Sequence, residues 1–137
     1  MNSIFMAEAI KEAKKASSKG NIPVGAVIVK DNQIIARAYN TKNTTNVATH
    51  HAEIIAIDKA CKKLKTWRLN ECIIYVTLEP CDMCYGAIKE ARIKKVVYIV
   101  NSKYKTLMEN REELIIETYK KDNSYLELLR DFFKDIR

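Results

Sequence analysis

Two short segments of the sequence carry side chains that could bind and use a metal ion. The first reads His-Ala-Glu from His51 to Glu53, and the second reads Pro-Cys-Asp-Met-Cys from Pro80 to Cys84. One imidazole and two thiolates, from His51, Cys81 and Cys84, suit a zinc ion whose fourth position stays open for water, as catalytic zinc sites require. Glu53 offers a carboxylate that can handle the protons of that water without binding the metal. The pattern predicts one zinc per chain and hydrolytic chemistry.

Other interpretations of these residues explain less of the pattern. A redox-active Cys-x-x-Cys pair would leave the His-x-Glu segment without a role. A structural zinc usually has four protein ligands, and Cys61 or Cys72 could supply the fourth. Cys61 lies more than two helical turns beyond His51, and Cys72 opens a strand at its far end, so both are expected to be small buried apolar residues. His50 competes with His51 as ligand, but only His51 has the carboxylate two residues later.

The first ligand segment stands at the start of a predicted helix. From Ala52 onward, apolar residues at 54, 55, 57, 60, 61 and 64 follow helical spacing, which indicates one buried face. His51 and Glu53 are therefore expected in the first turn, where free N–H groups give the helix end partial positive charge.

The second ligand segment follows a predicted strand. The apolar, β-branched run 72–78 is typical of a buried strand, and Pro80 favours the turn that ends it. A helix is expected from Cys81 or Asp82 to about Glu90. At a helix start the pKa of a thiol is lowered, which favours metal binding.

The remaining elements alternate between strands and helices. Asp31-Asn32 is expected to join two strands as a two-residue hairpin turn. The other predicted elements are a helix at 3–18, strands at 22–30, 33–40, 95–100 and 114–119, and a helix at 124–136 with Leu126, Leu129, Phe132 and Phe133 inward. This order predicts a three-layer α/β/α fold with a mixed sheet flanked by helices, and a site at the carboxyl ends of its parallel strands.

Length and composition are those of one small soluble enzyme. The 137 residues are enough for a single domain, 1–137, with its own core. No apolar run reaches membrane-spanning length, and the first residues lack the features of a signal peptide. Two of the four cysteines are assigned to metal and nothing indicates export, so we expect a cytoplasmic protein without a membrane partner.

The H-x-E…P-C-x-x-C pattern is the signature of zinc-dependent nucleobase and nucleoside deaminases. The chain from 22 to 100 closely resembles the cytidine-deaminase-like superfamily, and specifically the bacterial tRNA-specific adenosine deaminases. The matching segments are IPVGAVIV, HAEI, TWRL, and above all YVTLEPCDMCYGAI followed by ARIKKVVY. The resemblance implies a cytidine-deaminase-like fold with a five-stranded sheet, one Zn²⁺ per chain, a homodimer, and deamination of adenosine to inosine at the wobble position of a tRNA anticodon stem-loop.

The resemblance also implies a role for individual residues. Glu53 would pass protons from the activated water to the purine ring nitrogen and to the departing ammonia. Asn40 would hydrogen-bond the edge of the purine. The main chain at Ala52, and the turn that contains Pro23 and Val24, would shape the substrate pocket.

The sequence departs from the family pattern at two places. The residue before the ligand histidine is usually small, whereas here it is His50. After the fourth strand the family tends to continue into a Gly-Ala-x-Gly-Ser loop, whereas Asn101-Ser102-Lys103 is followed here by YKTLMENREE, without glycine. In relatives that region helps to hold the anticodon arm, so the second departure bears on the tRNA substrate.

A formal charge of +7 favours a phosphate-rich partner. Arg92, Lys103 and Lys105 are the predicted RNA contacts, within a basic cluster that also includes Lys89, Lys94 and Lys95. Two alternatives remain open: a deaminase of a free base or nucleoside such as guanine, cytosine or cytidine, and a zinc-stabilised RNA-binding module without catalysis. Glu53 distinguishes the last, because a structural zinc site has no need of it.

Overall fold

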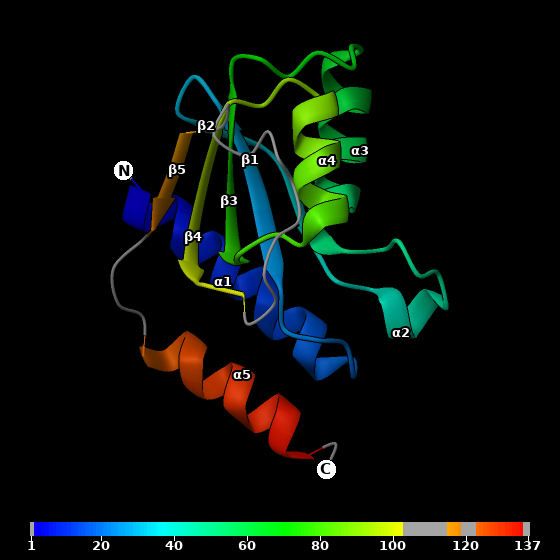
Figure 1. Ribbon diagram of the computed structural model, residues 1–137, viewed down its shortest axis with the longest axis vertical. Helices are drawn as coiled ribbons and strands as arrows, with labels where there is room; N and C mark the ends of the chain where they lie inside the picture. Colours follow the sequence, from blue (N-terminus) through cyan, green and yellow to red (C-terminus); the bar gives the residue numbers. More distant parts are fainter. Residues whose placement is uncertain (1, 103–114, 119–122, 136–137) are drawn as a thin grey trace.

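The computed structural model describes residues 2–102, 115–118 and 123–135, and these form one mixed sheet with helices on both faces (Figure 1). The strands are β1 (Gly25–Lys30), β2 (Gln33–Tyr39), β3 (Cys72–Leu78), β4 (Lys95–Val100) and β5 (Ile115–Thr118). The helices are α1 (Asn2–Ser18), α2 (Lys42–Thr45), α3 (Ala52–Leu64), α4 (Asp82–Glu90) and α5 (Asn123–Asp135).

The five strands lie in the order β2-β1-β3-β4-β5. β1 runs antiparallel to both β2 and β3, whereas β3, β4 and β5 are mutually parallel. Asp31 and Asn32 join β1 to β2 with φ angles of 51° and 61°, the left-handed values that a two-residue hairpin turn requires. The predicted hairpin and the predicted mixed, five-stranded α/β/α fold are both confirmed.

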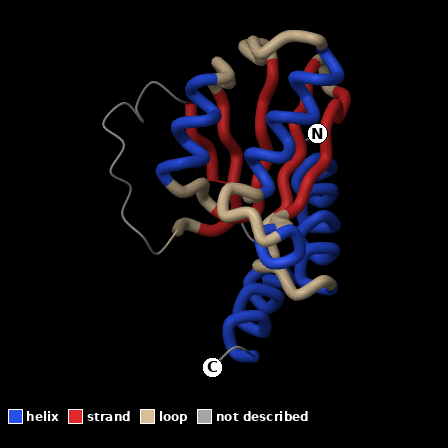
Figure 2. Tube along the Cα trace, turned by 90° about the vertical axis from the view of Figure 1, so that its right-hand side faces the viewer, coloured by secondary structure: helices blue, strands red, loops and turns tan. Residues whose placement is uncertain are grey.

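The sheet is buried on both faces, which explains why its central strands are almost continuously apolar. On one face, Ile28, Ile74 and Val96 pack against α3 and α4. On the other, Val27, Tyr75 and Val97 pack mainly against α1. In Figure 2 the strands lie side by side across the view, with helices in front of them and behind them. Within the described residues, no helix is both long enough and apolar enough to cross a membrane.

β1 begins later than the sequence predicts. It starts at Gly25, not at residue 22, and Val24 N instead donates to Ile22 O in a tight turn (2.8 Å). Gly25 is required because it crosses α1 closely: a Cβ there would stand 2.0 Å from Ala9 O. The start of β1 therefore lies in close contact with α1.

The inward face of the last helix is only partly as predicted. Leu129 is buried, but Phe133 is 42 % exposed, and Tyr125 is fully buried in the core beside α1. The prediction for Phe133 was wrong because the amphipathic spacing of α5 fits two adjacent faces, and the packing of Tyr125 in the core selects between them.

Candidate active site

The predicted metal ligands come together where two helices begin. His51 is the residue immediately before α3, and Cys81 stands in the same position before α4, both with extended backbone (φ −76°, ψ 153° and φ −74°, ψ 174°). Cys84 lies in the first turn of α4 and is fully buried. Neither His51 nor Cys81 uses its side chain to cap its own helix, so both side chains remain available to converge.

The spacing of these side chains fits a tetrahedral zinc ion. His51 Nδ1 lies 3.7 Å from Cys81 Sγ and 3.5 Å from Cys84 Sγ, and the three ligand atoms all lie within 4.8 Å of one another. With ordinary zinc–sulfur and zinc–nitrogen bond lengths, tetrahedral geometry separates such a sulfur and nitrogen by about 3.6 Å. In the part of the chain that the structure describes, this is the one group of three histidine, cysteine or acidic side chains able to hold a metal.

The pKa values of the three ligand side chains are shifted in different directions. A hydrogen bond from Cys84, supported by one from His51, lowers the pKa of the Cys81 thiol to about 4. The same contact with Cys81, together with burial, raises the pKa of Cys84. Hydrogen bonding to Cys81 raises the pKa of His51. Because zinc binds thiolates and neutral imidazole, binding at this site is expected to release protons.

Glu53 is buried beside the ligands. Its side chain is 3 % exposed, and this burial raises its pKa to about 7. A carboxyl group with a pKa near neutrality can both accept and donate a proton under physiological conditions, as a general acid–base must. A purely structural metal site would have no need of a buried acid–base group such as Glu53.

The competing ligands lie apart from this group. The His50 ring is held by Thr45, whose Oγ1 lies 2.8 Å from His50 Nδ1. Cys61 and Cys72 are free cysteines that contact the core formed by α3, α4 and the sheet.

Glu79 supports the second ligand segment, a role that the sequence analysis missed. Its carboxylate accepts hydrogen bonds from Tyr85 Oη (3.1 Å) and from Ser102 N (3.0 Å), and its own N–H donates to Val100 O (2.8 Å). These bonds tie the end of β3 to the end of β4 and to α4, immediately before Cys81. A glutamate between a buried strand and a metal ligand was the available signal.

Asn40, one of the predicted substrate residues, is held by hydrogen bonds in the loop that follows β2. Asn40 is 4 % exposed, its N–H donates to Val24 O (3.0 Å), and its Oδ1 accepts from Lys42 N (3.0 Å). Thr41 N donates to His50 O (3.1 Å), which connects this loop to the ligand segment. Ala52, between the ligand histidine and Glu53, is fully buried. The substrate contacts of Asn40, Ala52, Val24 and Pro23 stay predictions.

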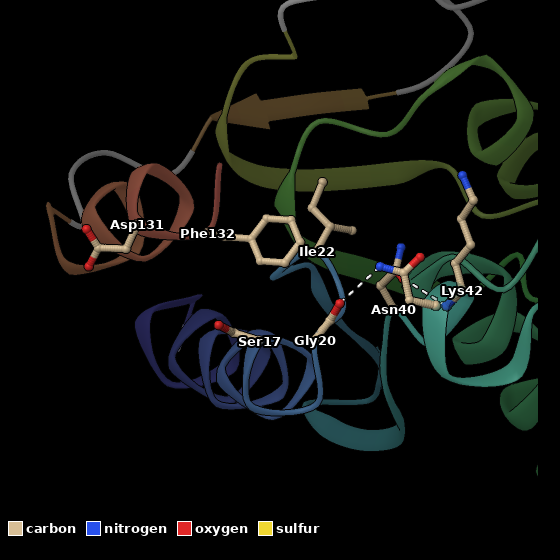
Figure 3. Close-up of a pocket in the computed structure, with 8 residues that line it drawn as sticks. Ser17, Gly20, Ile22, Asn40, Lys42, Asp131 and Phe132 are labelled. Carbon is tan, nitrogen blue, oxygen red and sulfur yellow. Dashed lines mark hydrogen bonds between the residues drawn. The ribbon is translucent and has the colours of Figure 1, made fainter. Parts of the chain in front are cut away.

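A cavity of about 530 Å³ is lined by Asn40 and by residues of α1, α2 and α5 (Figure 3). Ile22 and Phe132 form its apolar wall, and the remaining lining residues are Ser17, Gly20, Asn40, Lys42, Asn43 and Asp131. None of the three metal ligands lines it.

Tyr125 fixes the turn that carries two of the predicted substrate residues. Its hydroxyl donates to Pro23 O at 2.7 Å, and burial raises its pKa, which keeps the hydroxyl protonated. No local sequence pattern predicts this contact, because the two residues are 102 positions apart.

The predicted RNA contacts do not form one described surface. Arg92 follows the carboxyl end of α4, about 13 Å along the nine-residue helix from the end that holds Cys81. Lys103 and Lys105 lie outside the described residues. Their joint role in RNA binding stays a prediction.

Residues 1–100 match the family model described as the cytidine and deoxycytidylate deaminase zinc-binding region. The chain belongs to this family. The match includes all three zinc-ligand candidates and Glu53, so the donor set and the family agree on zinc as the metal of this deaminase-family chain.

Relatives of this deaminase-family chain include enzymes that act on RNA and on a free base. A tRNA-specific adenosine deaminase of Bacillus subtilis is 55 % identical over 95 residues, 69 % of this chain and 59 % of that protein. The chain thus spans less than two thirds of that relative. A structure from a study of A-to-I editing by tRNA:A34 deaminases is 36 % identical with a TM-score of 0.78, covering 88 % of this chain and 98 % of that one. A guanine deaminase from Bacillus subtilis is 34 % identical with a TM-score of 0.72, covering 98 % and 94 %.

Proposed function

We propose that residues 1–137 form one zinc-dependent deaminase domain that converts adenosine to inosine at the wobble position of a tRNA. The observation that carries the proposal is the convergence of His51, Cys81 and Cys84 beside the buried carboxyl of Glu53. The similarity to a protein named as a tRNA-specific adenosine deaminase supports the substrate.

In the proposed mechanism, proton transfer takes place at the metal ligands and Glu53, and the loop of Asn40 orients the base. His51, Cys81 and Cys84 would hold the zinc ion, which would lower the pKa of a water molecule and so supply the nucleophile for hydrolytic deamination. Glu53 accepts a proton from that water and returns protons to the ring nitrogen and to the leaving ammonia, a role that its pKa of about 7 supports. Asn40 orients the purine edge, and the main chain at Ala52, Pro23 and Val24 excludes bulk water from the base.

The same proposal includes the oligomeric state, the cellular location and the RNA contacts of the domain. We infer a homodimer that works in the cytoplasm on the anticodon stem-loop, with Arg92, Lys103 and Lys105 contacting phosphates. The formal charge of +7 supports an RNA substrate.

A free-base substrate is the second candidate, and the likeness to guanine deaminase is the observation that favours it. One set of parallel assays decides between the two. Zinc-loaded protein is incubated with a tRNA transcript whose anticodon begins with adenosine, and the wobble base is sequenced. Ammonia release is measured with guanine, cytosine, adenosine and cytidine. We expect inosine in the tRNA and little release from small molecules; the reverse result would assign a free-base deaminase.

The same assays test a zinc-stabilised RNA-binding module. Such a module would bind the transcript without deaminating any substrate. The Glu53→Ala variant is the matched control, because it should bind zinc and RNA as the wild type does and lose turnover.

A further inference from the structure

An exposed tryptophan between two arginines lies at the end of α3 and α4 remote from the metal ligands. Trp67 is 51 % exposed. The guanidinium carbons of Arg68 and Arg92 lie 5.0 and 5.4 Å from the centre of its indole ring, a cation–π distance. Arg68 comes from the loop after α3 and Arg92 from the loop after α4, and Leu69 N donates to Ala91 O (2.7 Å) to hold the two loops together. We call Trp67, Arg68 and Arg92 the Trp67 patch.

The charges of the Trp67 patch are not neutralised within the described chain. No acidic side chain among the described residues pairs with Arg68 or Arg92. Arg92 Nη1 donates to the carbonyls of Lys89 and Glu90, which gives it a helix-capping role as well. A guanidinium has five N–H donors, so most remain available to an acceptor from outside. Lys62, Lys63, Lys65 and Lys94, which are near the patch in the sequence, are also exposed.

We propose that the Trp67 patch is a second RNA-contact surface, which binds phosphates of the substrate RNA away from the reacting nucleotide. The inference rests on the proposed function, because it takes the substrate to be RNA. Both guanidinium groups lie against the same indole ring, which places their carbons within about 10 Å of each other. Each guanidinium is planar and can pair with a phosphate through two hydrogen bonds. The indole thus holds two phosphate-binding cations close together. In this arrangement Trp67 positions the arginines.

The distance between the Trp67 patch and the metal ligands sets the minimum size of a partner that contacts both. α3 has 13 residues and α4 has nine, so their lengths separate the Trp67 patch from the metal ligands by about 13–20 Å. The two ends are joined by the same pair of helices (Figure 1). A nucleoside cannot reach both, whereas a folded RNA of several nucleotides can.

Charge favours RNA over a second copy of the chain. A twofold-symmetric interface centred on the Trp67 patch would bring its arginines and neighbouring lysines toward the same cations of the partner. A phosphate backbone supplies the opposite charge and releases counterions on binding.

The test compares two variants with a matched control. Arg68→Gln with Arg92→Gln removes both charges and keeps the side-chain stems. Trp67→Ala keeps both charges and removes the ring. Lys11→Ala with Lys14→Ala removes two exposed charges from α1, on the other face of the sheet. Affinity for a tRNA transcript whose anticodon begins with adenosine is measured from about 50 to 300 mM salt, with zinc content, oligomeric state and saturated turnover measured alongside.

We expect the double-arginine variant to bind about tenfold more weakly at 0.1 M salt, with a log–log salt slope shallower by about 1.4, or about 0.7 for each phosphate that is no longer neutralised. Trp67→Ala should bind about two- to fivefold more weakly. Zinc content should not change, and the α1 control should bind as the wild type does.

Unchanged affinity and slope in the double-arginine variant, with a wild type that binds and deaminates the tRNA, would overturn the inference and leave the proposed function standing. A variant that changes oligomeric state would overturn it too, because the Trp67 patch would then be a protein interface. A wild type that binds no RNA would overturn both.

Discussion

The two ends of α3 and α4 differ in the kind of surface that they build. At the amino ends, His51, Cys81 and Cys84 are drawn together beside Glu53; Cys84 and Glu53 are buried, whereas His51 is half-buried and Cys81 is exposed. At the carboxyl ends, Trp67, Arg68 and Arg92 are exposed, and no described acidic side chain pairs with the two arginines. The same two helices thus provide, at one end, a metal-binding group beside a buried carboxyl and, at the other end, an exposed surface suited to anion binding. The difference indicates that chemistry and affinity can be changed separately.

The largest expected effect is at the metal end. Cys81→Ala should lose zinc and all measurable turnover, and its melting temperature should fall because metal binding contributes to folding free energy. Elemental analysis and thermal unfolding with and without a chelator are the measurements. Full zinc occupancy in this variant would remove Cys81 from the ligand set.

Glu53→Ala tests the chemistry of the same end without removing a ligand. It should retain zinc and fold, and lose about 10²–10⁴-fold in turnover, the usual contribution of a general acid–base. The assay is inosine formation at saturating enzyme. A wild-type rate would mean that another group moves the protons.

Charge reversal after β4 tests whether RNA affinity extends toward the loop region that lacks glycine. Lys103→Glu with Lys105→Glu should weaken tRNA binding, and the salt slope should become shallower by about 0.7 for each phosphate that these lysines neutralise, while zinc content stays constant. Filter binding over a salt series measures this. A slope equal to that of the wild type would exclude both lysines from the interface.

The smallest expected effect concerns the turn at Pro23, which is hydrogen-bonded to Tyr125 in the core. Tyr125→Phe leaves Pro23 O without its donor and should cost about 0.5–1.5 kcal/mol of unfolding free energy. Because Pro23 belongs to the predicted substrate turn, KM should rise more than kcat falls. Denaturant unfolding and steady-state kinetics measure the two effects. A loss of zinc would instead tie Tyr125 to the metal end.

The sequence predicted the parts of the molecule that depend on local pattern. The strand at 72–78 and the helix start at Ala52 agree with the structure residue by residue, because apolar spacing and Pro80 specify them locally. The zinc ligands were predictable because each sits at a helix start set by that pattern. His51 proved to be the residue before α3, one position outside the expected first turn.

What the sequence did not predict depends on contacts between distant segments. The bond from Tyr125 to Pro23 and the meeting of Trp67 with Arg92 join residues from different elements, and no local pattern encodes either. Glu79 was overlooked because its partners, Tyr85 and Ser102, come together only when β3 and β4 pair in parallel.

The separation of chemistry from affinity is tested most directly by single-turnover deamination of one tRNA. The wild type, Glu53→Ala, and Arg68→Gln with Arg92→Gln are each titrated against the same transcript, which gives a limiting rate and a Kd for each protein. We expect Glu53→Ala to lose the limiting rate and keep its Kd, and the double-arginine variant to keep the rate and bind more weakly. Absence of inosine with the zinc-loaded wild type, or variants that each change both quantities, would contradict it.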